Sequence, residues 1–139
     1  MSWLVFALLS AAAAAATAIL AKIGVKDVNS NLATAIRTVV ILAFAWGIVF
    51  ATGSQKELGR ISGHTLLFLV LSGIATGASW LFYFRALQLG KASQVAPVDK
   101  LSVVLTIVFA AVFLGEGLSW QVAAGATLLA SGILLITLA

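Results

Sequence analysis

The chain has 139 residues, of which 63% are hydrophobic and 9% are charged, and its mean hydropathy is +1.18. This composition excludes a soluble globular domain, in which roughly a quarter of the residues are charged. The net charge of +4 comes from scattered Lys and Arg residues without a basic cluster, so we expect no nucleic-acid partner. Because there is no Cys and a single His, we expect no metal site and no cofactor.

Five apolar segments follow one another along the chain, and each has about the 20 residues that one membrane crossing needs. They cover residues 3–21, 32–51, 65–84, 95–114 and 119–138. The connections between them are short and carry most of the charges. The sequence therefore predicts an all-α, polytopic membrane protein, in which five transmembrane helices form a single domain over residues 1–139.

The charges in the connections carry information on orientation. The first and third connections hold four cations and the second holds two: Lys22, Lys26, Arg85 and Lys91 against Lys56 and Arg60. The positive-inside rule then favours an outer N-terminus and an inner C-terminus by a small margin. A margin this small permits the chain to insert in both orientations, which is dual topology.

The second segment contains a charged residue, Arg37, within the run ATAIRTVVILAFAW. One interpretation is that its long side chain extends to the membrane surface. The other is that it pairs with Asp99 or with a substrate anion, because the guanidinium fork suits a carboxylate. Both interpretations remain open at the level of the sequence.

The third segment carries a polar stripe, whose members fall within about 60° of one helix face at 100° per residue. They are Ser72, Thr76, Ser79 and Tyr83. The stripe either lines a cavity or consists of hydroxyls that bond back to their own helix. Gly73 and Gly77 form a GxxxG pair suited to helix packing. Trp80 is either an aromatic wall of the cavity or a ring that faces lipid.

The fourth segment begins with Pro97, Asp99 and Lys100. A proline is tolerated in the first turn of a helix, which predicts a helix start near Ser93 or Val95. In a continuous helix Asp99 shares a face with Ser102 and Thr106, whereas Lys100 points about 100° away. Asp99 is then either a solvated charge at the membrane surface or a site charge that faces a cavity. Lys100 either pairs with a neighbouring helix or reaches the membrane surface.

The fifth segment has two glycines seven residues apart, Gly125 and Gly132, which share one helix face. Small residues let two helix backbones approach closely in a membrane. We therefore expect this face to contact another helix.

Two runs of the chain carry a family pattern. Residues 80–136 combine the motif YF.AL..G.AS..AP, a helix that closes in FLGE and a glycine-containing last helix; the run ATAIRTVVILAFAW contributes Arg37. Together they resemble one EamA repeat of the drug/metabolite transporter superfamily and cover essentially the whole chain. Most members have two repeats and ten helices, whereas this chain resembles the short, five-helix bacterial and archaeal branch. Its run PVDKLSVV departs from the longer members, which commonly have uncharged residues there.

The resemblance implies a secondary transporter, often an exporter, of small organic metabolites or drugs, located in the inner (plasma) membrane and without enzymatic activity. Many transporters are built from two inverted repeats, and this chain shows no internal duplication. We therefore expect an antiparallel homodimer that works by alternating access. The expected substrate-binding or coupling residues are Arg37, Trp80, Tyr83, Asp99 and Lys100, with Asp99 as the proton- or cation-coupling group. The expected cavity lining is Ser72, Thr76, Ser79, Ser102 and Thr106.

A second class of function is a membrane accessory, scaffold or lipid-binding subunit of a larger complex. It explains the small size and the glycine faces equally well. It explains the polar stripe and the charges within the apolar segments less well.

Overall fold

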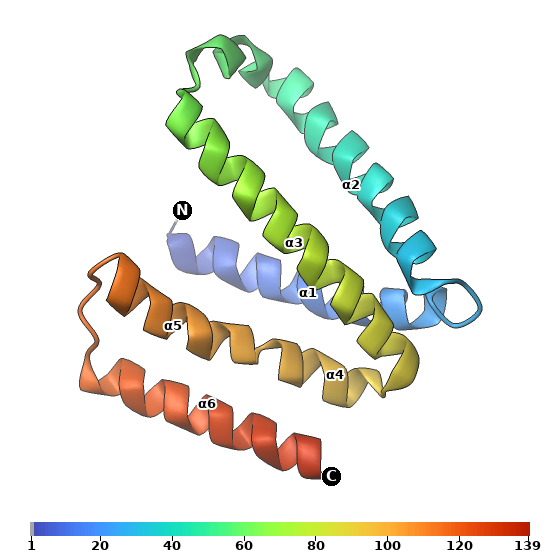
Figure 1. The fold of residues 1–139 in the computed structure, drawn as a ribbon, viewed down its shortest axis with the longest axis vertical. Helices are drawn as coiled ribbons and strands as arrows, with labels where there is room; N and C mark the ends of the chain where they lie inside the picture. Colours follow the sequence, from blue (N-terminus) through green and yellow to red (C-terminus); the bar gives the residue numbers. More distant parts are fainter. Residues whose placement is uncertain (1) are drawn as a thin grey trace. The chain divides into compact units, whose positions relative to one another are not determined.

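The computed structural model describes residues 2–139, which fold into six α-helices and one 3₁₀ helix (Figure 1). The elements are α1 (Trp3–Gly24), α2 (Ser30–Thr52), η1 (Ser54–Arg60), α3 (Gly63–Leu89), α4 (Ala92–Asp99), α5 (Leu101–Phe113) and α6 (Trp120–Leu138). Five stretches are long and apolar enough to cross a membrane, with α4 and α5 together forming the fourth. The predicted fold class, an all-α protein with five membrane-spanning helices, is confirmed.

The helices group into two compact units. The central unit is Ile19–Leu89, which holds the end of α1 together with α2, η1 and α3. The terminal unit contains Gly90–Ala139 and the earlier part of α1, up to Ala18. The prediction of a single domain stays a prediction.

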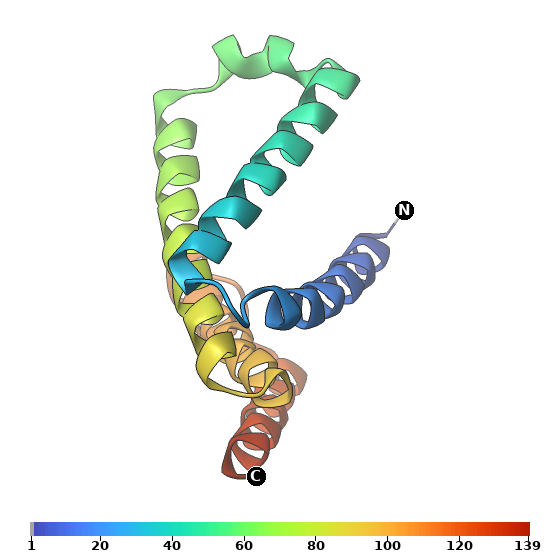
Figure 2. The same ribbon diagram turned by 90° about the vertical axis from the view of Figure 1, so that its right-hand side faces the viewer.

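In the central unit α2 and α3 are antiparallel neighbours. They approach each other where α2 begins and α3 ends, and they separate toward η1 (Figures 1 and 2). Asn29 caps the start of α2, because its Oδ1 accepts the N–H groups of Asn31 and Leu32 at 2.9 and 3.3 Å. Gly53 ends α2 in the left-handed conformation with φ 73°, which glycine adopts without steric cost. Both ends of α2 are thus encoded locally.

In the terminal unit α6 lies along α4 and α5 (Figure 1). One face of α6 is covered through small side chains, Ala123, Ala126 and Ala130, which are half-buried, and through Ile133, which is buried. Ser119 caps this helix, because its Oγ accepts the Val122 N–H at 3.3 Å. Small residues at these positions allow the close helix contact on which packing in lipid depends.

Two helix boundaries differ from the prediction. α3 continues to Leu89, whereas we expected a connection after Phe84. The fourth spanning segment starts at Ala92 and is divided at Lys100, which lies between α4 and α5. The start lies one residue before Ser93, close to the prediction, but Pro97 is past the first turn rather than within it.

The division at Lys100 follows from the chemistry of Pro97. Without an N–H, Pro97 gives no hydrogen bond to the preceding turn of the helix. The next turn tightens instead, since the Lys100 N–H donates to the Pro97 carbonyl at 2.9 Å over three residues rather than four. The face calculated for one continuous helix, which aligned Asp99 with Ser102 and Thr106, assumed a regular turn at this point.

Few side chains are buried within the chain. The buried apolar residues are Ala18, Val25, Phe84, Leu87 and Ile133. Most Leu, Val, Ile and Phe side chains of the helices are exposed, as expected where lipid rather than a protein core surrounds them. The buried residues of the central unit gather near the start of α2 and the end of α3, so this is the part of the unit that positions side chains most firmly.

Candidate functional site

A polar face of α2 is directed at α3. Ser30 and Thr34 on this face are buried, and Arg37 follows one turn later and is half-buried. The Thr34 hydroxyl donates to the Ser30 carbonyl at 2.9 Å, and the Thr38 hydroxyl donates to the Thr34 carbonyl at 2.8 Å. Neither threonine hydroxyl forms a hydrogen bond with the Arg37 side chain.

Arg37 lies over two aromatic rings of α3. Its guanidinium carbon is 4.7 Å from the centroid of the Trp80 ring and 5.2 Å from that of Phe84. Phe84 is buried and Trp80 is half-buried, while Tyr83 interacts electrostatically with the guanidinium. The two rings are one helical turn apart, so a single face of α3 presents both. The structure thus brings together three of the predicted site residues, Arg37, Trp80 and Tyr83.

Arg37 differs from the other cations of the spanning segments in its partners. Lys22 donates from Nζ to the Leu87 carbonyl, Arg85 donates to Gln88 Oε1 at 3.1 Å, and Lys100 pairs with Asp99. Within the central unit, all of which is described, no carboxylate or carbonyl oxygen forms an ion pair or hydrogen bond with Arg37. Its positive charge is met there by the faces of Trp80 and Phe84 and by the electrostatic interaction with Tyr83.

The predicted polar stripe of α3 is exposed along most of its length. Ser72, Thr76 and Ser79 are exposed and Tyr83 is half-buried. The Thr76 hydroxyl donates to the Ser72 carbonyl at 2.9 Å, which is the intrahelical bond that we weighed against a cavity role. A cavity-lining role for the stripe stays a prediction.

The remaining predicted site residues belong to the terminal unit. Asp99 Oδ2 lies 3.3 Å from Lys100 Nζ, and the Thr106 hydroxyl donates to the Ser102 carbonyl at 2.7 Å. Lys100 thus pairs with its chain neighbour. Asp99 is the one carboxylate within the spanning segments of the described residues, because the other acidic residues lie in connections.

The four glycines expected to support packing have open space around them. A methyl group added at any of them would meet no atom within 4 Å; they are Gly73, Gly77, Gly125 and Gly132. In α6 Gly132 is half-buried like Ala123, Ala126 and Ala130, whereas Gly125 is exposed. A role for these glycines in contact with another chain stays a prediction.

A network that the sequence did not predict fastens the first connection to the end of α3. Gln88 Nε2 donates to the carbonyls of Val25, at 3.0 Å, and Val28. Lys22 donates to the Leu87 carbonyl, which lies in the last turn of α3 and has no intrahelical donor. The sequence places Arg85 and Gln88 in a connection. The one signal for the network is that these two polar residues are three apart, which puts them on the same face if the helix continues.

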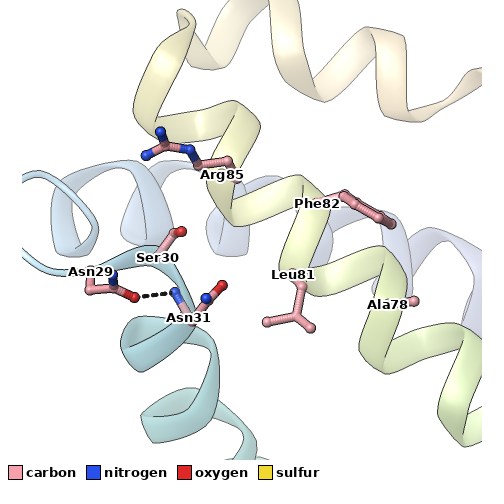
Figure 3. Close-up of a pocket in the computed structure, with 7 residues that line it drawn as sticks. All are labelled: Asn29, Ser30, Asn31, Ala78, Leu81, Phe82 and Arg85. Atoms are coloured by element: carbon pink, nitrogen blue, oxygen red, sulfur yellow. Dashed lines mark hydrogen bonds between the residues drawn. The ribbon is translucent and has the colours of Figure 1, made fainter.

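A cavity of about 590 Å³ flanks the start of α2 (Figure 3). Its lining residues are Asn29, Ser30, Asn31, Ala78, Leu81, Phe82 and Arg85. Two polar side chains of this cavity have structural roles. Asn29 caps α2, and Arg85 donates a hydrogen bond to Gln88. None of the predicted site residues lines it, and we place the candidate site at Arg37, Trp80, Tyr83 and Phe84 instead, called the Arg37 cluster below.

Comparison with known proteins adds information on the whole chain. Residues 1–138 match the EamA-like transporter family. A protein of Sinorhizobium sp. described as an uncharacterized transporter in the cobO 3′ region is 56% identical over 135 residues, which cover 97% of this chain and 96% of that protein. No solved structure matches the chain. Family and relative both indicate a multi-pass membrane transporter.

Proposed function

Because the chain belongs to the EamA-like transporter family, we propose that this membrane transporter moves small organic solutes by alternating access, as an exporter in the inner membrane. The observation that carries the proposal is the Arg37 cluster. A charged side chain within a spanning helix is costly and normally faces a bundle interior or a watery path. Arg37 is held against Trp80 and Phe84 in this way, so the cluster has the chemistry of a solute-binding site rather than of a lipid-facing surface.

The transporter works as an antiparallel homodimer. One chain holds a single five-helix repeat, whereas alternating access in many transporters involves two inverted repeats around a central site. The small charge difference between its connections allows the two orientations that such a dimer needs. The open glycines Gly73, Gly77, Gly125 and Gly132 are suited to close contact between the two copies.

Asp99 couples transport to an ion gradient. It is the one carboxylate in the spanning segments of the described residues, and a carboxylate can exchange a proton or bind a cation. Its pairing with Lys100 leaves it accessible, because the Asp99 side chain is 35% exposed and that of Lys100 is 53% exposed.

Flux through the purified protein tests the proposal. The chain is reconstituted alone into liposomes loaded with a mixture of small organic acids, amines and amino acids, and release is followed by mass spectrometry. We expect release above that of empty liposomes and loss of release in Arg37→Gln. The matched control is Arg60→Lys, which replaces an exposed arginine of η1 and keeps the charge of the second connection.

The opposing result is also specific. If the protein catalyses no flux alone, and is recovered from membranes only with an unrelated chain, it is an accessory subunit and not a transporter. If Arg37→Gln and the unmodified protein show equal flux, the Arg37 cluster does not bind the transported solute.

A further inference from the structure

The bonding capacity of Arg37 is only partly used. A guanidinium has a flat face that attracts aromatic rings and an edge with five N–H donors. The ring centroids of Trp80 and Phe84 lie 4.7 and 5.2 Å from the guanidinium carbon. Within the central unit Arg37 forms no ion pair with a carboxylate, and its polar neighbour there is Tyr83. An arginine without a carboxylate partner in a membrane span favours a further oxygen-bearing partner.

The surroundings restrict what that partner can be. The planar fork of a guanidinium matches the two oxygens of a carboxylate, which it binds bidentately. The half-buried ring of Trp80 beside it offers a flat apolar surface. The acidic residues of the central unit, Asp27 and Glu57, lie in the first connection and in η1, so nothing in the cluster compensates a positive charge on the solute.

We propose that the Arg37 cluster binds organic monoanions, in which a carboxylate meets the guanidinium edge and a flat apolar body lies against Trp80. This inference rests on the proposed transport function and names its substrate class. The two rings hold the guanidinium in place before the solute arrives, so little side-chain freedom is lost on binding. A solute amine is disfavoured because Arg37 repels it.

A matched ligand series tests the charge requirement on the unmodified protein. Phenylacetate, phenylacetamide and phenethylamine share a ring and a similar size but carry a negative, a neutral and a positive head. Binding of each to the detergent-solubilised protein is measured by isothermal titration calorimetry. We expect phenylacetate to bind at least about ten-fold more tightly than the amide, as for loss of a charge-assisted hydrogen bond, and the amine to bind most weakly.

Variants assign the effect to Arg37. Arg37→Gln is expected to weaken phenylacetate binding by about ten-fold or more and to leave phenylacetamide binding almost unchanged. Arg37→Lys keeps the charge but not the planar fork, so an intermediate affinity is expected. The control is Arg60→Lys, whose affinities should equal those of the unmodified protein. If Arg37→Gln does not fold, the ligand series on the unmodified protein still decides the question.

Several outcomes overturn the inference. Failure of phenylacetate to bind, equal binding of the three compounds, or phenylacetate binding that survives Arg37→Gln would each contradict it. A lipid phosphate could also supply oxygens to the guanidinium, so dihexanoyl phosphatidate is titrated in parallel. Phosphatidate binding that is lost in Arg37→Gln, together with no binding of phenylacetate, would assign the cluster to lipid and overturn the inference.

The failure of this inference can be told apart from failure of the proposed function. Release of amines or neutral solutes from liposomes, without phenylacetate binding, supports the transport function and contradicts organic monoanions as the substrate class. Phenylacetate binding that depends on Arg37, without release of any solute from liposomes, supports monoanion binding by the cluster and contradicts the transport function.

Discussion

The guanidinium of Arg37 lies 4.7 Å from the centroid of the Trp80 ring, and this contact joins the first half of α2 to the second half of α3. Figure 2 shows that α2 and α3 approach each other where α2 begins and α3 ends. A cation over an aromatic face in a desolvated setting contributes up to about 2 kcal/mol. The contact therefore both positions the proposed binding group and holds the helix pair together.

Replacing Trp80 should disturb both roles. We expect Trp80→Leu to lower the free energy of unfolding by roughly 0.5–2 kcal/mol and to reduce flux strongly, because Arg37 loses the larger of its two rings. Trp80→Phe should retain part of both, since a smaller ring remains. Thermal unfolding in detergent and flux in liposomes are the measurements.

The control for Trp80 is another aromatic residue on the same helix. Phe82 is 77% exposed and is not in contact with Arg37, so Phe82→Leu should leave unfolding and flux almost unchanged. A Trp80→Leu protein that matches Phe82→Leu in both measurements would show that the ring does not hold Arg37.

Gln88 should contribute to stability about as much as Trp80 does, although it lies outside the proposed site. Its amide donates to the Val25 and Val28 carbonyls and its oxygen accepts from Arg85. Val25 is 1% exposed, so Gln88→Leu leaves a carbonyl of a buried residue without a donor. We expect a loss of about 1–3 kcal/mol, measured by thermal unfolding, and faster amide hydrogen exchange in the first connection.

A second glutamine provides the comparison. Gln121 is exposed near the start of α6, so Gln121→Leu should not change unfolding. Equal unfolding temperatures for the two leucine variants would mean that the first connection is not fastened by Gln88. A loss of stability with unchanged hydrogen exchange in that connection would point to a different cause.

The spans were predictable from the sequence, but the pairing of their faces was not. Runs of about 20 apolar residues identify membrane helices without reference to their neighbours. Helical periodicity also shows which residues of one helix share a face. It does not show which face of α2 meets which face of α3, and so Phe84 was missed as the second ring over Arg37.

The end of α3 was missed for a related reason. Arg85 and Gln88 are polar, and polar residues after an apolar run predict a connection. In the structure they remain helical because their polar groups bond each other and the carbonyls of the first connection. Pro97 was placed in a first turn by the same local reasoning, whereas α4 starts earlier at Ala92. Such long-range partners are not visible in the local pattern of one sequence.

Asp99 should matter for coupling and little for stability. Its ion pair with Lys100 joins neighbours along the chain, and both side chains are partly exposed, so the pair contributes at most about 1 kcal/mol. We expect Asp99→Asn to unfold at nearly the same temperature as the unmodified protein. Uptake driven by a pH gradient should be abolished, because an amide does not exchange a proton.

The comparison for Asp99 is Glu116→Gln, which removes an acidic residue from the connection between α5 and α6. That variant should retain pH-driven uptake. If Asp99→Asn also retains it, Asp99 is not the coupling group. A large loss of stability in Asp99→Asn would instead indicate a structural role.

The orientation of the chain can be read from its two ends. The chain has no Cys, so Ser2→Cys and Ala139→Cys each place one thiol near a terminus. Five spans put the termini on opposite sides of the membrane. In a dual-topology population, a membrane-impermeant maleimide added to intact cells should label part of the protein in each variant. Labelling of only one of the two variants would exclude dual topology, and with it the antiparallel dimer.

The charges of the second connection provide a control on this experiment. With Lys56→Gln and Arg60→Gln, the first and third connections still hold Lys22, Lys26, Arg85 and Lys91, and the second connection holds no cation. The positive-inside rule then favours an outer N-terminus much more strongly. Labelling at Ala139→Cys should fall and labelling at Ser2→Cys should rise. Because an antiparallel dimer needs both orientations, flux should fall together with the labelling at Ala139→Cys, and flux that persists in a one-sided population would require a parallel assembly.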